Sequence, residues 1–107
     1  MRIAVTAQGG ELTSELDPRF GRAKWFVILD TETGEHEAMD NSAGVNAPSG
    51  AGVATGQKIV ESGAKTVITG HCGPNAERVL TSAGIQIVER TGGTVAEAID
   101  AFKKEEL

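Results

Sequence analysis

The sequence has little cysteine, and this scarcity excludes several kinds of site. It contains one cysteine among 107 residues. One thiol excludes an internal disulfide, and it excludes a zinc or iron–sulfur site built only from this chain's thiolates, because those sites need two to four of them. A lone free thiol without an opening signal peptide favours a reducing compartment, so we expect a cytoplasmic protein.

Long apolar runs are also missing. A membrane-spanning helix needs about 20 consecutive apolar residues, and no run in this sequence approaches that length, so we expect a soluble chain without a membrane partner. Fourteen glycines, only three prolines and no low-complexity tract indicate a compact α/β domain with many tight turns. The length suits one core, and residues 1–107 are expected to form a single domain.

Positive charge is scarce as well. Ten lysines and arginines against fifteen acidic residues give a net charge of −5 and an isoelectric point near 4.9. Non-specific binding to nucleic acid depends on lysine and arginine, so nucleic acid is not an expected partner. Arg19, Arg22 and Lys24 form a local exception, which is either an anion contact or an ordinary solvated loop.

The first half of the chain predicts a three-stranded meander followed by a helix. Short β-favouring runs predict strands at residues 2–7 and 25–30, and a polar strand is predicted at 35–41 after a hairpin turn. Residues 9–24 and 42–52 are predicted loops, and loops as long as the first are usually functional. In the helix predicted at 51–62, Gly52 and Gly56 each cost about 1 kcal/mol relative to alanine. That cost is understandable if backbone or ligand must come close.

The second half alternates strands and helices. Residues 64–69 form the continuous apolar run of a buried strand, and Pro74 suits the first turn of a helix predicted at 74–83. A strand at 85–88 follows, and Thr94 with Glu97 forms a capping box that opens the last helix. The order β-β-β-α-β-α-β-α predicts an α/β, ribonuclease H-like fold, in which helices flank a five-stranded mixed sheet.

The first predicted strand carries no carboxylate. Ribonuclease H-like nucleases place metal-binding carboxylates on this strand, whereas residues 3–7 here are Ile-Ala-Val-Thr-Ala. Asp17, Asp30 and Asp40 fall in loops or at strand ends, where aspartate commonly forms turns. The sequence therefore argues against a nuclease.

Cys72 lies at a predicted junction between a strand and a helix. The helix dipole and unpaired N–H groups at such a junction favour an anion and lower the pKa of a thiol. Cys72 and Arg78 also have the Cys-x5-Arg spacing of phosphatases that attack with a thiolate, a mechanism that needs a wide loop of N–H groups around the phosphate. Pro74 starts the helix too early for that loop, and Asn75 stands where a glycine is expected. A Cys72-dependent phosphatase is therefore an alternative rather than the main prediction.

A soft, metal-containing anion is a further possibility. Ligands of open α/β sheets bind outside the carboxyl ends of the strands, where residues 70–73 and 42–52 are expected to converge. Metal–sulfide clusters are polarizable anions that accept hydrogen bonds from helix N-termini and glycine loops. The soft or borderline donors Cys72, His71 and Met39 are too few to ligate a cluster alone, and Met39 also suits a packing role.

The order and spacing of two motifs resemble the dinitrogenase iron–molybdenum cofactor biosynthesis family. The motifs are Phe20-Gly21-Arg22-Ala23-x-x-Phe26 and, after a glycine-rich loop, Ile68-Thr69-Gly70-x-x-Gly73-Pro74-Asn75-Ala76. The resemblance covers Met1 to about Phe102, and it implies a ribonuclease H-like fold and a non-enzymatic protein that binds or carries a metal cluster. Small free-standing members from sulfate-reducing bacteria suggest a molybdenum–copper sulfide cluster held non-covalently, with the iron–molybdenum cofactor or a precursor as the alternative.

The resemblance and the anion-binding features together define an expected site. The expected cofactor-binding residues are Arg22, Ser49, Gly50, Gly52, Gly70, His71, Cys72, Gly73 and Asn75. The family pattern leaves the two positions between Gly70 and Gly73 variable, so it does not imply direct ligation by Cys72. We expect storage, transfer or biosynthesis of the cluster, with unidentified partner proteins in its delivery. A cofactor-free interaction module with an acidic working surface is the remaining alternative.

Overall fold

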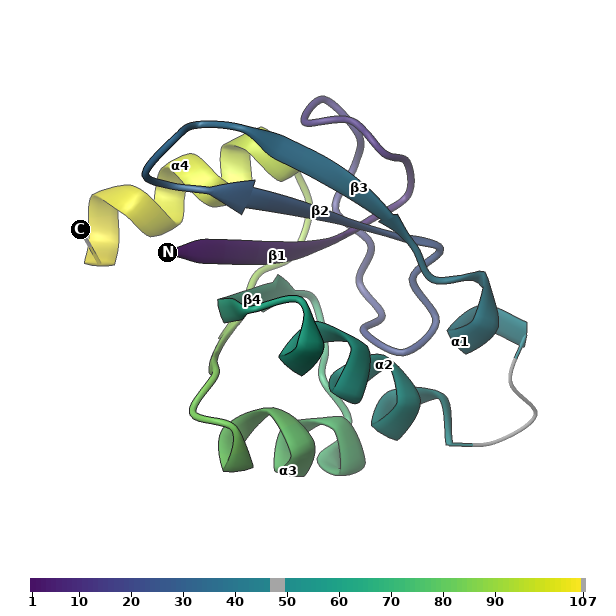
Figure 1. Ribbon diagram of the computed structural model, residues 1–107. Coiled ribbons are helices and arrows are strands. Elements are labelled where there is room, and N and C mark those ends of the chain that lie inside the picture. Colours follow the sequence, from purple (N-terminus) through teal and green to yellow (C-terminus); the bar gives the residue numbers. More distant parts are fainter. Residues whose placement is uncertain (47–49, 107) are drawn as a thin grey trace.

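The computed structural model describes residues 1–46 and 50–106 as nine helices and strands (Figure 1). In chain order these are β1 (Arg2–Ala7), β2 (Trp25–Asp30), β3 (His36–Asp40), α1 (Ser42–Asn46), α2 (Ala51–Glu61), β4 (Ala64–Thr69), α3 (Pro74–Ser82), β5 (Gln86–Glu89) and α4 (Val95–Glu106). Within the described ranges, no helix is both long enough and apolar enough to span a membrane.

The strands form one mixed sheet in the order β3-β2-β1-β4-β5. The first three strands pair antiparallel through short connections, whereas β4 lies parallel to both β1 and β5. Parallel neighbours need a crossover connection, and α3 makes the one between β4 and β5. This arrangement confirms the predicted α/β, ribonuclease H-like fold with a five-stranded sheet.

The core has one apolar layer on each face of the sheet. On one face α4 packs through Ile99 and Phe102, and on the other α2 and α3 pack through Ile59 and Leu80. Figure 1 shows α4 on the opposite side of the sheet from α2 and α3. Alternate residues of β1 belong to the two layers, because successive side chains of a strand point to opposite faces. The near-continuous apolar run of β1 follows from this burial on both sides.

The sequence prediction missed α1 and shifted several boundaries by a residue or two. Residues 42–46, predicted as part of a loop, form a short helix in which the N–H groups of Gly44 and Val45 donate to the Asn41 carbonyl over 3.0 and 3.1 Å. A helix of five residues is too short to show a periodic pattern. The strands predicted at 35–41 and 85–88 occupy 36–40 and 86–89.

The N-terminus of α4 has its backbone donors satisfied. The capping box is confirmed, since the Thr94 N–H donates to Glu97 Oε1 over 2.8 Å and the Glu97 N–H donates to Thr94 Oγ1 over 3.2 Å. Next to it, the N–H groups of Val95 and Ala96 donate to carbonyls of the loop between β1 and β2, each over 2.9 Å. This loop therefore closes the start of α4.

Replacing Thr94 by alanine removes the capping hydroxyl of α4. We expect Thr94→Ala to lower the free energy of unfolding by about 1 kcal/mol, the usual value of such a cap. Urea denaturation followed by circular dichroism measures the change. Thr91→Ala, at an exposed position just before α4, is the matched control. Equal stabilities of the two variants would contradict a stabilising role for the capping box.

Candidate functional site

A groove of about 300 Å³ lies where the N-termini of α2 and α3 meet the loop between β1 and β2. We call it the helix-end groove. Its lining residues are Gly21, Arg22, Gly50, Ala51, Gly52, Val53, Gly73, Pro74, Asn75 and Ala76. It lies near the carboxyl end of β4, because α3 begins a few residues after that strand. This is the edge of the sheet at which ligands of open α/β folds bind.

Two glycines allow α2 and α3 to pack closely beside this groove. A Cβ atom on Gly52 would lie 3.3 Å from the Cβ of Ala76, and one on Gly56 would lie 3.1 Å from Cγ1 of Val79. Both contacts are tighter than ordinary packing, so side chains at these two positions would push the helices apart. The sequence predicted that backbone or a ligand comes close to these two glycines, and in the structure their neighbour is α3.

The loop between β1 and β2 supplies the third wall. A Cβ atom on Gly21 would lie 3.1 Å from the backbone nitrogen of Gly52, so the loop backbone runs directly against the start of α2. Further back, a Cβ atom on Gly70 would lie 2.5 Å from Cα of Pro18, which places the loop directly over the residue that follows β4. Gly70 thus allows the loop to cross the end of the strand, and it does not line the groove.

Buried hydrogen bonds hold this loop in place. The Thr6 hydroxyl donates to the carbonyl of Asp17 over 2.6 Å, and its oxygen also lies 3.0 Å from Oγ1 of Thr69, within hydrogen-bond distance. The Asp17 carboxylate, almost fully buried, accepts the N–H of Arg19 over 2.9 Å. These contacts join the loop to the ends of β1 and β4, and they fix the path of the chain toward the groove.

The N-termini of α2 and α3 leave backbone donors open to the groove. The N-caps are Gly50 and Gly73, and neither has a side chain that could accept a hydrogen bond. The first helical bonds run from Ala54 to the Gly50 carbonyl and from Glu77 to the Gly73 carbonyl. Donors before them find no acceptor among residues 1–46 and 50–106, unlike those of α4. These are the N–H groups of Ala51, Gly52, Val53, Asn75 and Ala76.

Gly73 is not required by the folded backbone. Its φ of −67° and ψ of 166° suit any residue, and a Cβ atom there would have no neighbour within 4 Å. Serine, aspartate or asparagine would stabilise a helix from this position by about 0.3 kcal/mol relative to glycine. Gly50 differs, because its φ of 74° favours glycine. The missing side chain at Gly73 keeps the groove open at some cost in helix stability.

The charges at the groove are positive. Arg22 is the single charged residue in its described lining, and two helix N-termini add partial positive charge. The guanidinium of Arg22 donates to the carbonyls of Val45 over 2.9 Å and Gly44 over 3.3 Å, at the end of α1. The groove is thus suited to an anion, although the whole chain carries a net charge of −5.

The structure brings five of the expected site residues together and separates the others. Arg22, Gly50, Gly52, Gly73 and Asn75 line the helix-end groove, and Ser49 lies outside the described residues. His71 and Cys72 are not among its lining residues, and neither is Gly70. The lining residues that the sequence prediction missed are Gly21, Ala51, Val53, Pro74 and Ala76. Of these, Gly21, Pro74 and Ala76 belong to the two motifs of the family resemblance.

Cys72 faces a different groove, of about 410 Å³, between α3 and β5. Its side chain is only 6% exposed, and burial raises the pKa of the thiol to about 11, with the carboxylates of Glu77 and Glu89 adding to the rise. The prediction of a lowered thiol pKa is therefore wrong, because burial and negative charge outweigh the helix end. His71 is exposed on the surface, where its Nδ1 lies 3.8 Å from Oε2 of Glu89.

The geometry of a thiolate phosphatase is not formed around Cys72. As predicted, α3 begins at Pro74, so no wide loop of N–H groups separates the thiol from the helix. Arg78 is exposed and lines a separate hollow on α3 with Glu77 and Thr81. With the pKa of Cys72 near 11, the thiolate is also scarce at neutral pH.

Met39 and the other metal donors are dispersed. Met39 packs against the apolar layer that contains Phe26, its partner across β2 and β3. Within the described part of the chain, no group of three or more histidine, cysteine, aspartate or glutamate side chains is arranged to hold a metal ion.

Comparisons with known proteins give consistent matches along the chain. The model of the dinitrogenase iron–molybdenum cofactor family matches residues 1–105. The apo form of the orange protein from Desulfovibrio gigas superposes with a TM-score of 0.94 at 42% identity, covering 98% of this chain and 88% of that one. A NifB-like protein of Thermotoga gives 0.85 at 38% identity, covering 96% and 87%. An uncharacterised protein of Methanocaldococcus jannaschii is 30% identical over 105 residues, 95% of this chain and 85% of its own length.

The raised pKa of Cys72 predicts how the thiol titrates. The ultraviolet absorbance of the thiolate should rise around pH 11 in the folded protein and near the ordinary value of 9.0 in denaturant. The unfolded state then loses its proton first, so the free energy of unfolding should fall between pH 9 and pH 11. No tyrosine is present to add tyrosinate absorbance. Cys72→Ser is the control that removes the step, and a folded-state titration at or below pH 9 would contradict the buried thiol.

Proposed function

The chain belongs to the dinitrogenase iron–molybdenum cofactor family, and from this premise we propose that it binds an anionic, molybdenum-containing metal–sulfide cluster in the helix-end groove. The molybdenum–copper sulfide implied by the family resemblance is the first candidate cargo, and the iron–molybdenum cofactor or a precursor is the second. The role is storage, transfer or biosynthesis of the cluster rather than catalysis. We assign it to the cytoplasm, in keeping with the single free thiol.

The observation that carries this proposal is the pair of glycine N-caps beside one groove. At the two helix ends that begin with Gly50 and Gly73, five backbone donors have no acceptor within residues 1–46 and 50–106, whereas the donors of α4 are satisfied by the chain itself. An anion that accepts these donors would gain hydrogen bonds and the favourable field of both helix dipoles. The empty space at Gly73 leaves room for such a group.

The lining favours a sulfide cluster over a strongly hydrated anion such as phosphate. Ala51, Val53, Pro74 and Ala76 give the groove an apolar component, which polarizable sulfides tolerate. The groove has no thiolate or imidazole in its described lining, so metals held there would keep sulfide as their ligand. The protein would then contribute shape, N–H donors and the charge of Arg22, without displacing a sulfide from the metal.

A substitution that adds a side chain at Gly73 should affect cluster binding and protein stability differently. In Gly73→Asp, the carboxylate can cap α3, so we expect the free energy of unfolding to stay equal or to rise by about 0.3 kcal/mol, because glycine is already a tolerated N-cap. The same carboxylate occupies the groove and repels an anion, so uptake of tetrathiomolybdate with copper should fall by at least about tenfold, or 1.4 kcal/mol. Visible absorption during titration of the apo protein measures uptake.

Two variants control this experiment. Gly73→Ala adds a methyl group without charge and should give an intermediate loss. Cys72→Ser changes the neighbouring residue, which faces the other groove, and should leave uptake unchanged. Undiminished uptake by Gly73→Asp would contradict binding in the helix-end groove. Complete loss in Cys72→Ser would indicate direct ligation by the thiol instead.

Arg22 provides a separate test of the charge in the groove. We expect Arg22→Ala to weaken uptake of the same cluster several-fold, and to flatten its dependence on salt, because one screened attraction is removed. Arg78→Ala removes an exposed arginine of α3 outside the groove and is the matched control. Titrations at low and high salt measure both effects, with circular dichroism verifying that α1 persists without its contact to Arg22. If both variants behave alike, Arg22 has no part in binding.

A further inference from the structure

The outer edge of β5 is open for backbone pairing. β5 lies at one end of the sheet, and no strand in the described ranges pairs with its outer side. The N–H of Arg90 donates to the carbonyl of Thr69 over 2.9 Å, so the backbone groups of Arg90 point toward β4. Because backbone groups alternate in direction along a strand, those of Val88 also point toward β4. The backbone N–H and carbonyl groups of Ile87 and Glu89 therefore point outward, away from the sheet.

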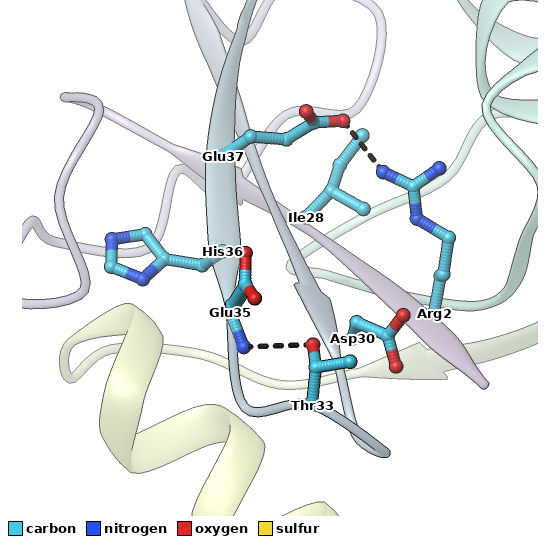
Figure 2. A pocket seen from close by; sticks show the side chains of 7 residues that line it. All are labelled: Arg2, Ile28, Asp30, Thr33, Glu35, His36 and Glu37. Carbon is cyan, nitrogen blue, oxygen red and sulfur yellow. Dashed lines mark hydrogen bonds and ion pairs between the residues drawn. The ribbon is translucent and has the colours of Figure 1, made fainter.

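The opposite edge of the sheet is better protected. β3 carries exposed charged side chains, and Glu37 forms an ion pair of 2.6 Å with Arg2, as Figure 2 shows. Arg2 also donates to the carbonyl of Ser62 over 2.7 Å, so its charge ties this corner of the sheet together. A Cβ atom on Gly10 would lie 3.0 Å from the Cβ of Ala38, because the long loop runs against β3. Charge and a covering loop commonly prevent edge pairing.

A groove lies beside the open edge of β5. This edge groove is the one that Cys72 faces, and its other lining residues are Glu77, Thr81, Ile85, Gln86, Ile87 and Glu89. Cys72 and Ile85 are buried and Ile87 is half-buried, so they make an apolar base. Two glutamates supply the charge, one from α3 and one from β5. If another strand paired with the outer edge of β5, its side chains would contact the partly apolar, acidic surface of this groove.

Among the described residues, no lysine or arginine forms an ion pair with the two glutamates of the edge groove. Glu77 forms no ion pair with any described residue, and Glu89 has only His71, at 3.8 Å, which is a cation only when protonated. Arg90, the next residue along the chain, lies 3.5 Å from Glu105 on α4. The two carboxylates also help to raise the pKa of Cys72, so their field reaches the base of the groove.

A second copy of this chain fits the edge poorly. Symmetric pairing of β5 with itself would add a second Glu77 and a second Glu89 to an edge that is already acidic, and like charges that come opposite each other in a strand pair are destabilising. A strand that carries lysine or arginine has the complementary charge. Lysine and arginine also cover apolar surface with their alkyl stems while their charged ends reach polar groups.

We propose that the edge of β5 and the edge groove dock an extended basic segment of a partner protein. Its backbone pairs with Ile87 and Glu89, and one lysine or arginine lies in the groove, with its stem on Ile85 and Ile87 and its charge toward Glu77 and Glu89. This is strand addition, in which backbone bonds supply affinity and pockets for alternate side chains supply specificity. Cys72 lines the edge groove and Gly73 the helix-end groove, so the partner would bind next to the cargo without occupying its site.

A synthetic peptide tests the proposal on the apo protein. The probe is a capped hexapeptide with the sequence Thr-Lys-Val-Lys-Val-Thr, added to isotope-labelled protein and followed by nuclear magnetic resonance. We expect shifts at the amides of β5 and Cys72, and new protection from hydrogen exchange at Ile87 and Glu89. The Val88 amide faces β4 and should be protected already in the free protein, which makes it the internal control.

Matched peptides and variants separate pairing from general attraction to an acidic protein. A peptide with glutamate in place of lysine should bind at least about tenfold more weakly, equivalent to 1.4 kcal/mol. A peptide with methylated backbone nitrogens keeps its charge but cannot pair, and it should not protect Ile87 or Glu89. The double variant Glu77→Gln/Glu89→Gln should weaken the lysine peptide severalfold. Glu61→Gln, an exposed change on α2, should not.

Three results would overturn the proposal. They are equal binding of the lysine and glutamate peptides, binding of the lysine peptide that leaves Ile87 and Glu89 unprotected, and protection of both amides in the free protein at high concentration. The last result would favour a second copy of this chain. The peptide experiment uses no metal and the Gly73 variants use no peptide, so failure of this proposal and failure of cluster binding are distinguishable.

Discussion

The close contact between α2 and α3 is the constraint on which the rest of the candidate site depends. Gly52 lies against Ala76 and Gly56 against Val79, at separations that leave no room for a Cβ atom on α2 without displacement. Each glycine costs about 1 kcal/mol of helix stability relative to alanine. The close packing that these glycines allow places the N-termini of α2 and α3 side by side, and Gly21 of the β1–β2 loop lies against the start of α2. The same backbone approach therefore determines both the packing and the shape of the groove.

Among the three long helices, α2 and α3 have N-terminal N–H groups without an acceptor in the described residues, whereas α4 does not. Thr94, Glu97 and carbonyls of the β1–β2 loop satisfy the donors of α4. At α2 and α3 the N-caps are glycines, and at Gly73 neither backbone conformation nor crowding explains the residue. Among the described residues, α4 thus has side-chain caps, whereas α2 and α3 begin without one at the same groove. Helix N-termini that lack a side-chain cap and lie at a concave, positively charged surface are the pattern expected of an anion site.

Much of the fold could be predicted from the sequence, because the strands of the core are continuous apolar runs and its helices carry apolar residues at regular spacing. The buried runs of β1, β2 and β4 and the capping box at Thr94 were all visible. The helix α1 was missed, since its single turn depends on bonds to the Asn41 carbonyl rather than on an apolar face. The direction of Cys72 was also invisible. No local pattern in the sequence indicates which of the two grooves a loop residue lines.

The residues at the start of α3 separate two surfaces of opposite charge. On one side, Gly73 opens a groove in which Arg22 and two helix ends supply positive charge. On the other, Cys72 lies in a groove with Glu77 and Glu89, and the pKa of its thiol is raised by burial and by those carboxylates. A diffuse negative charge would be attracted to the first surface and repelled by the second. The carboxylates that help to make Cys72 a poor nucleophile are therefore consistent with the proposal of an anionic cargo in the helix-end groove and with the proposal of a basic partner at the edge of β5.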